Sequence, residues 1–317
     1  MKKPLNDIPT EVVNLISVVS GIVTIISPIV SIIITIKTDI KPNVFWVFST
    51  ASLILFCIIL FFRMKKYRTL SKERLEVVSE NIHKSMHNSR DIFFDIMHSH
   101  KLKHLNEEML NYTYKTKLST ILDHLCNILA SYTKRKVCAC IKIVYCKNTE
   151  EEKKITDDAV ELVTFCRSNN SDTERDNYER QKKRIFLKDN TDFKEIISGE
   201  FGKDYFYQPN LIEYEEKRKK DGSCYENTNK TWSKYYKSTI VVPIRIEFKR
   251  LYHTKNEEPY DIIGFLCVDS EYTDAFTEKQ EKYNVDIIKA YADTIYVLLS
   301  QYRHYLRKIY QGENAKN

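Results

Sequence analysis

The stretch TIVVPIRIEF (residues 239–248), followed by DIIGFLCVDS (residues 261–270), decides the fold. Both segments are rich in Val, Ile and Phe, which favour strands because branched and aromatic side chains pack well on a pleated surface. The connection between them, residues 249–260, is polar. Two apolar strands joined by a short polar connection are typical of antiparallel neighbours, so we expect a sheet built around this pair.

Helices and further strands are predicted on both sides of this pair. A long helix is expected over residues 277–309, where apolar residues recur at steps of three and four. Residues 168–190 are polar and are predicted as a loop. The pattern indicates an α+β fold, with further helices over 118–129 and 192–197 and further strands over 137–145 and 161–167.

Three motifs in this order resemble those of the GAF domain family, including its membrane-anchored prokaryotic members. They are YYKSTIVVPI (235–244), IIGFLCVDS (262–270) and AFTEKQ (275–280), and the resemblance covers about residues 115–305. It implies an antiparallel sheet flanked by helices, with a ligand pocket on one face beneath the variable segment 193–236. The Asn-Lys-Phe-Asp-Glu signature of the cyclic-nucleotide members is absent from the sequence, so the resemblance leaves the cofactor unknown.

The variable segment 193–236 is rich in aromatic residues. Aromatic walls suit flat ligands such as nucleobases or tetrapyrroles, but the same rings can also close a core beneath a long loop. The resemblance implies these candidate ligand-binding residues: Phe193, Tyr205, Tyr207, Tyr214, Trp232, Tyr235, Tyr236, Ser238, Cys267 and Asp269.

Two uncharged apolar runs occupy residues 12–36 and 44–62. A helix needs roughly 20 apolar residues to cross a bilayer, so a transmembrane hairpin is expected over residues 1–64. A cleaved signal peptide is the weaker alternative for the first run, because no small-residue cleavage site follows it. Six basic residues and one acidic residue give residues 63–74 a net charge of +5. The positive-inside rule therefore predicts a multi-pass protein of the inner (plasma) membrane with both termini in the cytoplasm.

The charge balance disfavours one class of partner. Outside the basic segment, residues 75–317 carry a net charge of only +1, which gives no argument for nucleic-acid binding. The basic segment 63–74 is better explained by contact with anionic headgroups, so membrane lipids are an expected partner.

Small and polar residues recur along one face of the first apolar run. Such a face predicts close packing against another helix, either within the hairpin or in an oligomer. A polar path through an oligomer is the alternative. The residues of this membrane stripe are Asn14, Ser17, Thr24, Ser31 and Thr35.

Residues 65–111 are predicted as one connector helix between the hairpin and the sensor domain. The segment has no Gly or Pro, and apolar residues such as Leu75, Ile82 and Phe93 recur at helical spacing. This pattern has weak coiled-coil character and predicts parallel pairing in a homodimer. The GAF-like sensor domain is expected over residues 112–310, followed by a tail over 311–317.

Motifs for catalysis are missing from the sequence. It has no phosphate-binding loop, no nucleophile elbow and no metalloprotease motif, so we predict neither an enzyme nor a metal site.

The leading hypothesis is a membrane-anchored sensor in which a small molecule changes helix packing in a dimer, with the hairpin or a partner receiving the signal. One alternative is a membrane-perturbing effector, as in some prokaryotic defence systems, whose hairpins oligomerise on ligand binding. A further alternative is reduction of free methionine sulfoxide by Cys224 and Cys267.

Overall fold

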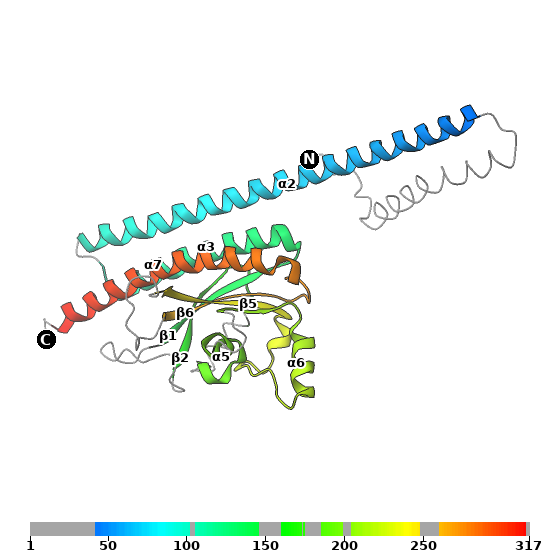
Figure 1. Ribbon diagram of the computed structural model, residues 1–317. Coiled ribbons are helices and arrows are strands. Elements are labelled where there is room, and N and C mark those ends of the chain that lie inside the picture. Colours follow the sequence, from blue (N-terminus) through cyan, green and yellow to red (C-terminus); the bar gives the residue numbers. More distant parts are fainter. Residues whose placement is uncertain are drawn as a thin grey trace. The chain divides into compact units, whose positions relative to one another are not determined.

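The computed structural model describes residues 42–101, 105–145, 160–172, 174, 185–198, 204–247 and 260–314. The chain divides into one unit that ends at Leu75 and a second unit that begins at Glu76 and holds all the described strands (Figure 1). The first apolar run and its membrane stripe lie outside the described residues. Within the described residues, no helix has an apolar window of the length and hydropathy needed to cross a membrane.

The described residues form a six-stranded antiparallel sheet in the order β3-β2-β1-β6-β5-β4. The two apolar strands predicted over residues 239–248 and 261–270 are adjacent, with Ser238 opposite Ser270 and Glu247 opposite Tyr260. The predicted α+β fold with an antiparallel sheet flanked by helices is confirmed. The strands are β1 (Cys138–Tyr145), β2 (Glu161–Arg167), β3 (Ile185–Phe186), β4 (Phe206–Gln208), β5 (Ser238–Glu247) and β6 (Tyr260–Ser270).

The pairing of the two central strands depends on a glycine. A Cβ atom built on Gly264 of β6 would lie 2.3 Å from the backbone oxygen of Lys142 on β1. No side chain fits at that distance. The strands approach this closely only because residue 264 has no Cβ atom.

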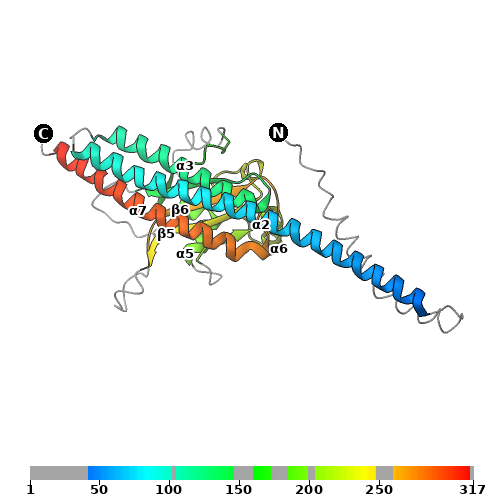
Figure 2. The same cartoon turned by 90° about the horizontal axis from the view of Figure 1, so that it is seen from above.

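Two long helices, α3 (Glu107–Thr133) and α7 (Glu281–Asn314), pack on one face of the sheet (Figure 2). Alternate strand residues point toward them, so Leu266 and Val268 of β6 belong to the same buried cluster as the inner residues of both helices. At the start of α3, the side chain of Asn106 accepts a hydrogen bond of 2.8 Å from the backbone N–H of Met109. At its end, Lys134 adopts a left-handed conformation with φ of 56°.

The helix α2 (Pro42–Lys101) contains the second apolar run and most of the predicted connector. The prediction of one continuous helix over residues 65–111 is wrong, because α2 ends at Lys101 and α3 begins at Glu107. The cap formed by Asn106 is the physical reason, since it starts a new helix there. Within the second unit, α2 packs on α3 and α7 and buries Ile92 and Ile96 completely.

Short helices and loops cover the opposite face of the sheet. They enclose a second buried cluster, in which Val241 and Phe265 of the sheet meet Phe193, Leu211 and Trp232. The helix predicted over 192–197 is confirmed as α5. The helical elements of this region are η1 (Leu187–Asp189), α5 (Thr191–Ser198), α6 (Leu211–Lys220) and η2 (Trp232–Lys234), and η4 (Glu278–Gln280) precedes α7.

Candidate ligand-binding site

A cavity of about 60 Å³ lies on the face of the sheet opposite α3 and α7. Strands β1, β2, β3, β5 and β6, the start of α5 and the loop before η2 contribute to its walls. Charged side chains of both signs line it, namely Lys142, Arg167, Asp192 and Asp269. The other lining residues among those described are Cys140, Ile185, Asn190, Phe193, Asn227, Thr228, Asn229, Tyr236, Thr239 and Cys267.

Strand alternation builds the floor of the cavity. On β1, Ala139 and Ile141 join the cluster under the helices, while Cys140 and Lys142 line the cavity. Cys140 lies opposite Cys267 of β6, and the two thiols are hydrogen-bonded. This hydrogen bond, together with burial, raises the pKa of the Cys267 thiol well above its usual value. The reactive thiolate form is therefore scarce at neutral pH.

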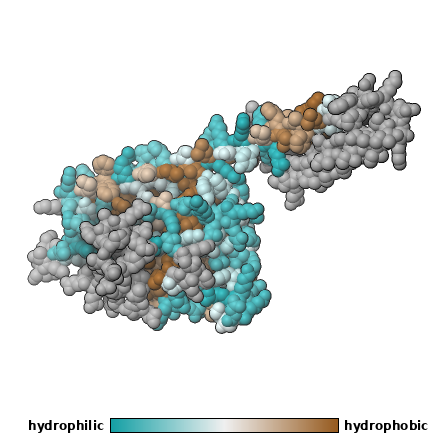
Figure 3. All heavy atoms as spheres, viewed as in Figure 1, coloured by the Kyte–Doolittle hydropathy of each residue, from teal (hydrophilic) through white to brown (hydrophobic). Residues whose placement is uncertain are grey.

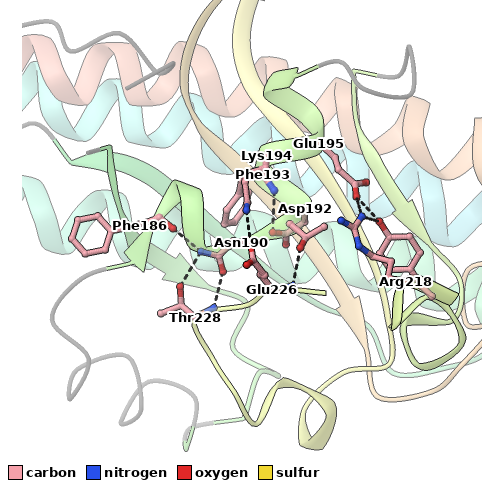
Figure 4. Close-up of polar contacts among 11 residues, drawn as sticks. Phe186, Asn190, Asp192, Phe193, Lys194, Glu195, Arg218, Glu226 and Thr228 are labelled. Atoms are coloured by element: carbon pink, nitrogen blue, oxygen red, sulfur yellow. Dashed lines mark hydrogen bonds and ion pairs between the residues drawn. The ribbon is translucent and has the colours of Figure 1, made fainter. Parts of the chain in front are cut away.

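Hydrogen bonds fix the start of α5 to the loop before η2 (Figure 4). The side-chain amide of Asn190 donates to the hydroxyl of Thr228 at 2.9 Å, and the backbone N–H of Thr228 donates to Asn190 Oδ1 at 3.0 Å. The backbone N–H of Thr191 donates to the carbonyl of Glu226 at 3.0 Å, and the backbone N–H of Glu226 donates to the hydroxyl of Thr191 at 2.8 Å. Lys194 and Glu226 also form an ion pair. This wall of the cavity is held by many directional contacts.

Asp192 is a buried acid in this wall, with a relative exposure of 6%. Its Oδ1 accepts a hydrogen bond of 3.0 Å from the backbone N–H of Phe193. Burial raises the pKa of the Asp192 carboxyl to about 7, although this hydrogen bond and the charge of Lys142 act in the opposite direction. The carboxyl therefore changes its charge near neutral pH, and a cationic group placed beside it favours the ionised form.

The structure brings a minority of the sequence-predicted ligand residues to the cavity. Phe193 and Tyr236 line it from the variable segment, and Cys267 and Asp269 line it from β6. Four of the ten predicted residues therefore line this cavity, two from the end of β6 and two from the aromatic set.

Three of the other predicted residues make contacts away from the cavity. The hydroxyl of Tyr205 donates to Glu281 at 2.7 Å, and the hydroxyl of Tyr207 donates to the carbonyl of Thr277 at 2.8 Å. Both tyrosines therefore face the α7 side of the sheet. Ser238 donates to the carbonyl of Tyr272 at 2.9 Å, which fixes the turn after β6.

The remaining predicted residues, Tyr214, Trp232 and Tyr235, belong to a packed aromatic cluster. The ring centroids of Tyr225 and Trp232 lie 5.2 Å apart, and those of Phe206 and Tyr214 lie 5.8 Å apart. These rings close a core, which is the second of the two alternatives raised by the sequence. A cavity of about 60 Å³ is also far smaller than the roughly 300 Å³ or more of pockets for drug-sized ligands, so it does not accommodate a nucleobase or a tetrapyrrole.

Sequence reasoning missed the charged residues Lys142, Arg167 and Asp192. A signal was present for the first of them, because Lys142 interrupts the otherwise apolar strand CACIKIVY. Since side chains alternate along a strand, that lysine shares a face with Cys140. No comparable signal marks Asp192, because only the tertiary fold brings α5 over β1.

The geometry gives no support for methionine sulfoxide reduction by Cys224 and Cys267, or for a metal site. Cys224 is exposed and does not line the cavity, and the thiol beside Cys267 is that of Cys140. Within the described part of the chain, no group of His, Cys, Asp and Glu residues is arranged to hold a metal ion.

Comparisons of the chain with protein-family models, with curated proteins and with solved structures give no match.

Proposed function

We propose that this chain is a membrane-anchored sensor. Its GAF-like domain binds a small molecule in the cavity, and the bound state is transmitted through α2 in a homodimer to the membrane segment or to a partner. The domain acts in this proposal as a binding module and not as an enzyme. The resemblance to GAF domains supports it through three ordered motifs, together with a sheet whose long helices and cavity lie on opposite faces.

The observation that carries the proposal is the position of β1 between the cavity and the contacts of α2. Cys140 and Lys142 of β1 line the cavity, while Ile141 belongs to the buried cluster that includes Ile92 of α2. A hydrogen bond also joins α2 to α3, because His124 Nδ1 lies 3.1 Å from Asn81 Oδ1. A ligand that shifts β1 therefore acts on the same packed cluster that holds α2, which gives a contiguous route for coupling.

Exposed apolar side chains near the start of α2 support membrane contact. Leu53, Ile54, Phe61 and Phe62 are each more than half exposed, and Figure 3 draws this part of the surface in brown. Apolar patches of this kind mark surfaces that contact lipid or protein. The basic segment 63–74 follows directly, as expected where a chain leaves a bilayer on the cytoplasmic side.

A second group of exposed apolar residues on α2 supports dimerisation. The predicted coiled-coil seam divides in the structure, because Val78 and Ile96 pack into the domain while other residues of the seam stay outside. The exposed members recur at steps of four, seven and four residues, which keeps them on one face of the helix. We name this face the outer stripe, and it consists of Ile82, Met86, Phe93 and Met97.

The test uses the full chain in lipid nanodiscs. The protein is incubated with a bacterial metabolite extract, washed, and analysed by mass spectrometry for retained small molecules. Hydrogen exchange of residues 76–101 is then measured with and without the retained compound. We expect at least one retained compound, loss of retention in Lys142→Met, and a change of exchange in α2.

A matched control is Lys217→Met, because Lys217 is an exposed lysine of α6 that does not line the cavity. Retention should be unchanged in this control. The sensor proposal fails if nothing is retained, or if a retained compound leaves exchange in residues 76–101 unaltered.

A further inference from the structure

Two cysteines face each other on neighbouring strands at the centre of the sheet. Cys140 of β1 and Cys267 of β6 are directly opposite in the antiparallel register, and both line the cavity. Directly opposed residues of antiparallel strands have Cα atoms about 4.5–5.5 Å apart. A disulfide bond requires a Cα separation of about 4.4–6.8 Å, so the backbone of this pair already lies in the range for one.

The two thiols also point to the same side of the sheet. Since side chains alternate along a strand, Cys140 shares the cavity face of β1 with Lys142, whereas Ala139 and Ile141 point to the helices. Cys267 lines the cavity from β6, and its thiol is hydrogen-bonded to that of Cys140. Opposed Cβ atoms lie about 4.5–5.5 Å apart and those of a disulfide about 3.8 Å apart, so closure needs a movement of only about 1 Å.

The register selects this pair from the other thiols. Among the cysteines that the structure describes, no other two are opposite each other in the sheet. Cys138 is opposite Asp269, and Cys166 is opposite Ile141 in the cluster beneath the helices. The remaining described cysteines lie outside the strands.

We propose that Cys140 and Cys267 form an oxidative modification site, at which hydrogen peroxide produces a reversible disulfide bond between β1 and β6. The inference goes beyond the proposed function, because it requires no bound ligand. Ala139 and Ile141, which flank Cys140, belong to the same buried cluster as Ile92 of α2. The link between the strands would therefore act on the packing that holds α2.

The reaction balances with two thiols and one molecule of peroxide. The thiolate of one cysteine attacks the O–O bond, which gives a sulfenic acid and releases the other oxygen, with a proton, as water. The second thiol then attacks the sulfenic sulfur, which forms the S–S bond and releases a second water. Two electrons pass from the sulfurs to the peroxide, and both thiol protons end in the two waters.

The size of the cavity favours a small oxidant. A water molecule needs about 15 Å³ of such space, so a cavity of about 60 Å³ holds on the order of four waters. Hydrogen peroxide has two non-hydrogen atoms and fits this space, whereas glutathione disulfide, a pair of linked tripeptides, does not. Cys140 and Cys267 are only 2% and 7% exposed, so a bulky oxidant cannot reach them without opening of the fold.

The surroundings of the pair make the reaction slow. The hydrogen bond to Cys140 and burial raise the pKa of the Cys267 thiol, although the charge of Lys142 acts in the opposite direction. Since the thiolate is the nucleophile, only a small fraction of this thiol is reactive at neutral pH. The site therefore responds to sustained exposure to peroxide. In the cytoplasmic location that the proposed function gives to this domain, cellular thiols reduce the disulfide again.

The experiment treats the folded full chain in detergent with hydrogen peroxide, blocks the remaining thiols with iodoacetamide, and maps the tryptic peptides by mass spectrometry. Cys140 lies in the peptide 137–142 and Cys267 in the peptide 256–279. We expect peroxide to join these two peptides and dithiothreitol to separate them. The first peptide also contains Cys138, so Cys138→Ser is the matched control, which should keep the link, whereas Cys140→Ser should lose it.

Glutathione disulfide is the comparison oxidant, and it should form the link more slowly than peroxide does. Three results would overturn the inference: recovery of Cys267 as a thiol or as a sulfinic or sulfonic acid, a link from Cys267 to another cysteine, or equal rates with the two oxidants. The map of the unsubstituted chain decides the first two without a risk of misfolding. A failure of the nanodisc experiment to retain any metabolite would remove the sensor proposal and leave this inference standing.

Discussion

Ser85 Oγ of α2 lies 2.9 Å from the hydroxyl oxygen of Tyr291 on α7, and both residues are buried. This hydrogen bond joins two helices through residues that are 206 positions apart in the sequence. We predict that Tyr291→Phe destabilises the packing of α2 by about 1–3 kcal/mol, because a buried hydroxyl of Ser85 loses its partner. Faster hydrogen exchange in residues 76–101 and a lower urea midpoint would show it.

The matched control is Tyr310→Phe, which removes a comparable hydrogen bond from an exposed site. The hydroxyl of Tyr310 donates to Glu107 at 2.9 Å, where water can replace the lost partner. The control should have little effect on exchange in α2. Equal effects of the two substitutions would show that the contact between Ser85 and Tyr291 does not hold α2 in place.

Gly264→Ala should be among the most damaging single substitutions in the sheet. The added Cβ atom would meet the backbone oxygen of Lys142 at 2.3 Å, and backbone cannot move aside as a flexible side chain can. We expect a loss of about 3 kcal/mol in unfolding free energy, measured by urea titration. Gly222→Ala is the control: it has open space around its Cβ but a φ of +76°, so it should cost only about 1 kcal/mol. A milder effect at Gly264 than at Gly222 would contradict this account.

The sequence predicted the two longest strands well and the cavity poorly, for a physical reason. Strands β5 and β6 are long and apolar, so local pattern identifies them, whereas β3 and β4 have only two and three residues and carry no periodic signal. The cavity combines Lys142 with Asp192, which lie in different elements and meet only after the sheet forms. Likewise, the apolar seam of α2 gave no indication that Ile96 packs inward while Met97 stays exposed.

Asp192→Asn should change how stability depends on pH. The folded-state pKa of about 7 is raised above the unfolded value of about 3.8, so the folded state holds this proton more tightly. The stabilising contribution is therefore complete below about pH 4 and is lost as the pH rises through 7. We predict that the unfolding free energy of the variant, relative to that of the unsubstituted chain, rises by a few kcal/mol from about pH 4 to about pH 7. Urea midpoints of the two proteins measure this difference.

His124 contributes to the pH dependence of stability with the opposite sign. Burial lowers the pKa of its imidazole, so its own contribution weakens as the pH falls below about 6.5. This contribution is common to both proteins and cancels in their difference. A difference that is independent of pH would show that Asp192 is not protonated in the folded state at mildly acidic pH.

The outer stripe of α2 makes a prediction about assembly. Ile82, Met86, Phe93 and Met97 are each at least 39% exposed, and a fully buried side chain of this size contributes roughly 1.5–3 kcal/mol. In a symmetric dimer each of these residues is buried once from each protomer, so its contribution counts twice. Met86→Glu combined with Phe93→Glu should therefore convert the full chain in detergent from dimer to monomer, as measured by light scattering. Lys84→Glu is the control, because it places the same charge on another exposed face of α2 and breaks only a surface ion pair with Glu80. A dimer that survives the double substitution, or dissociates in the control as well, would place the contact between the two copies elsewhere.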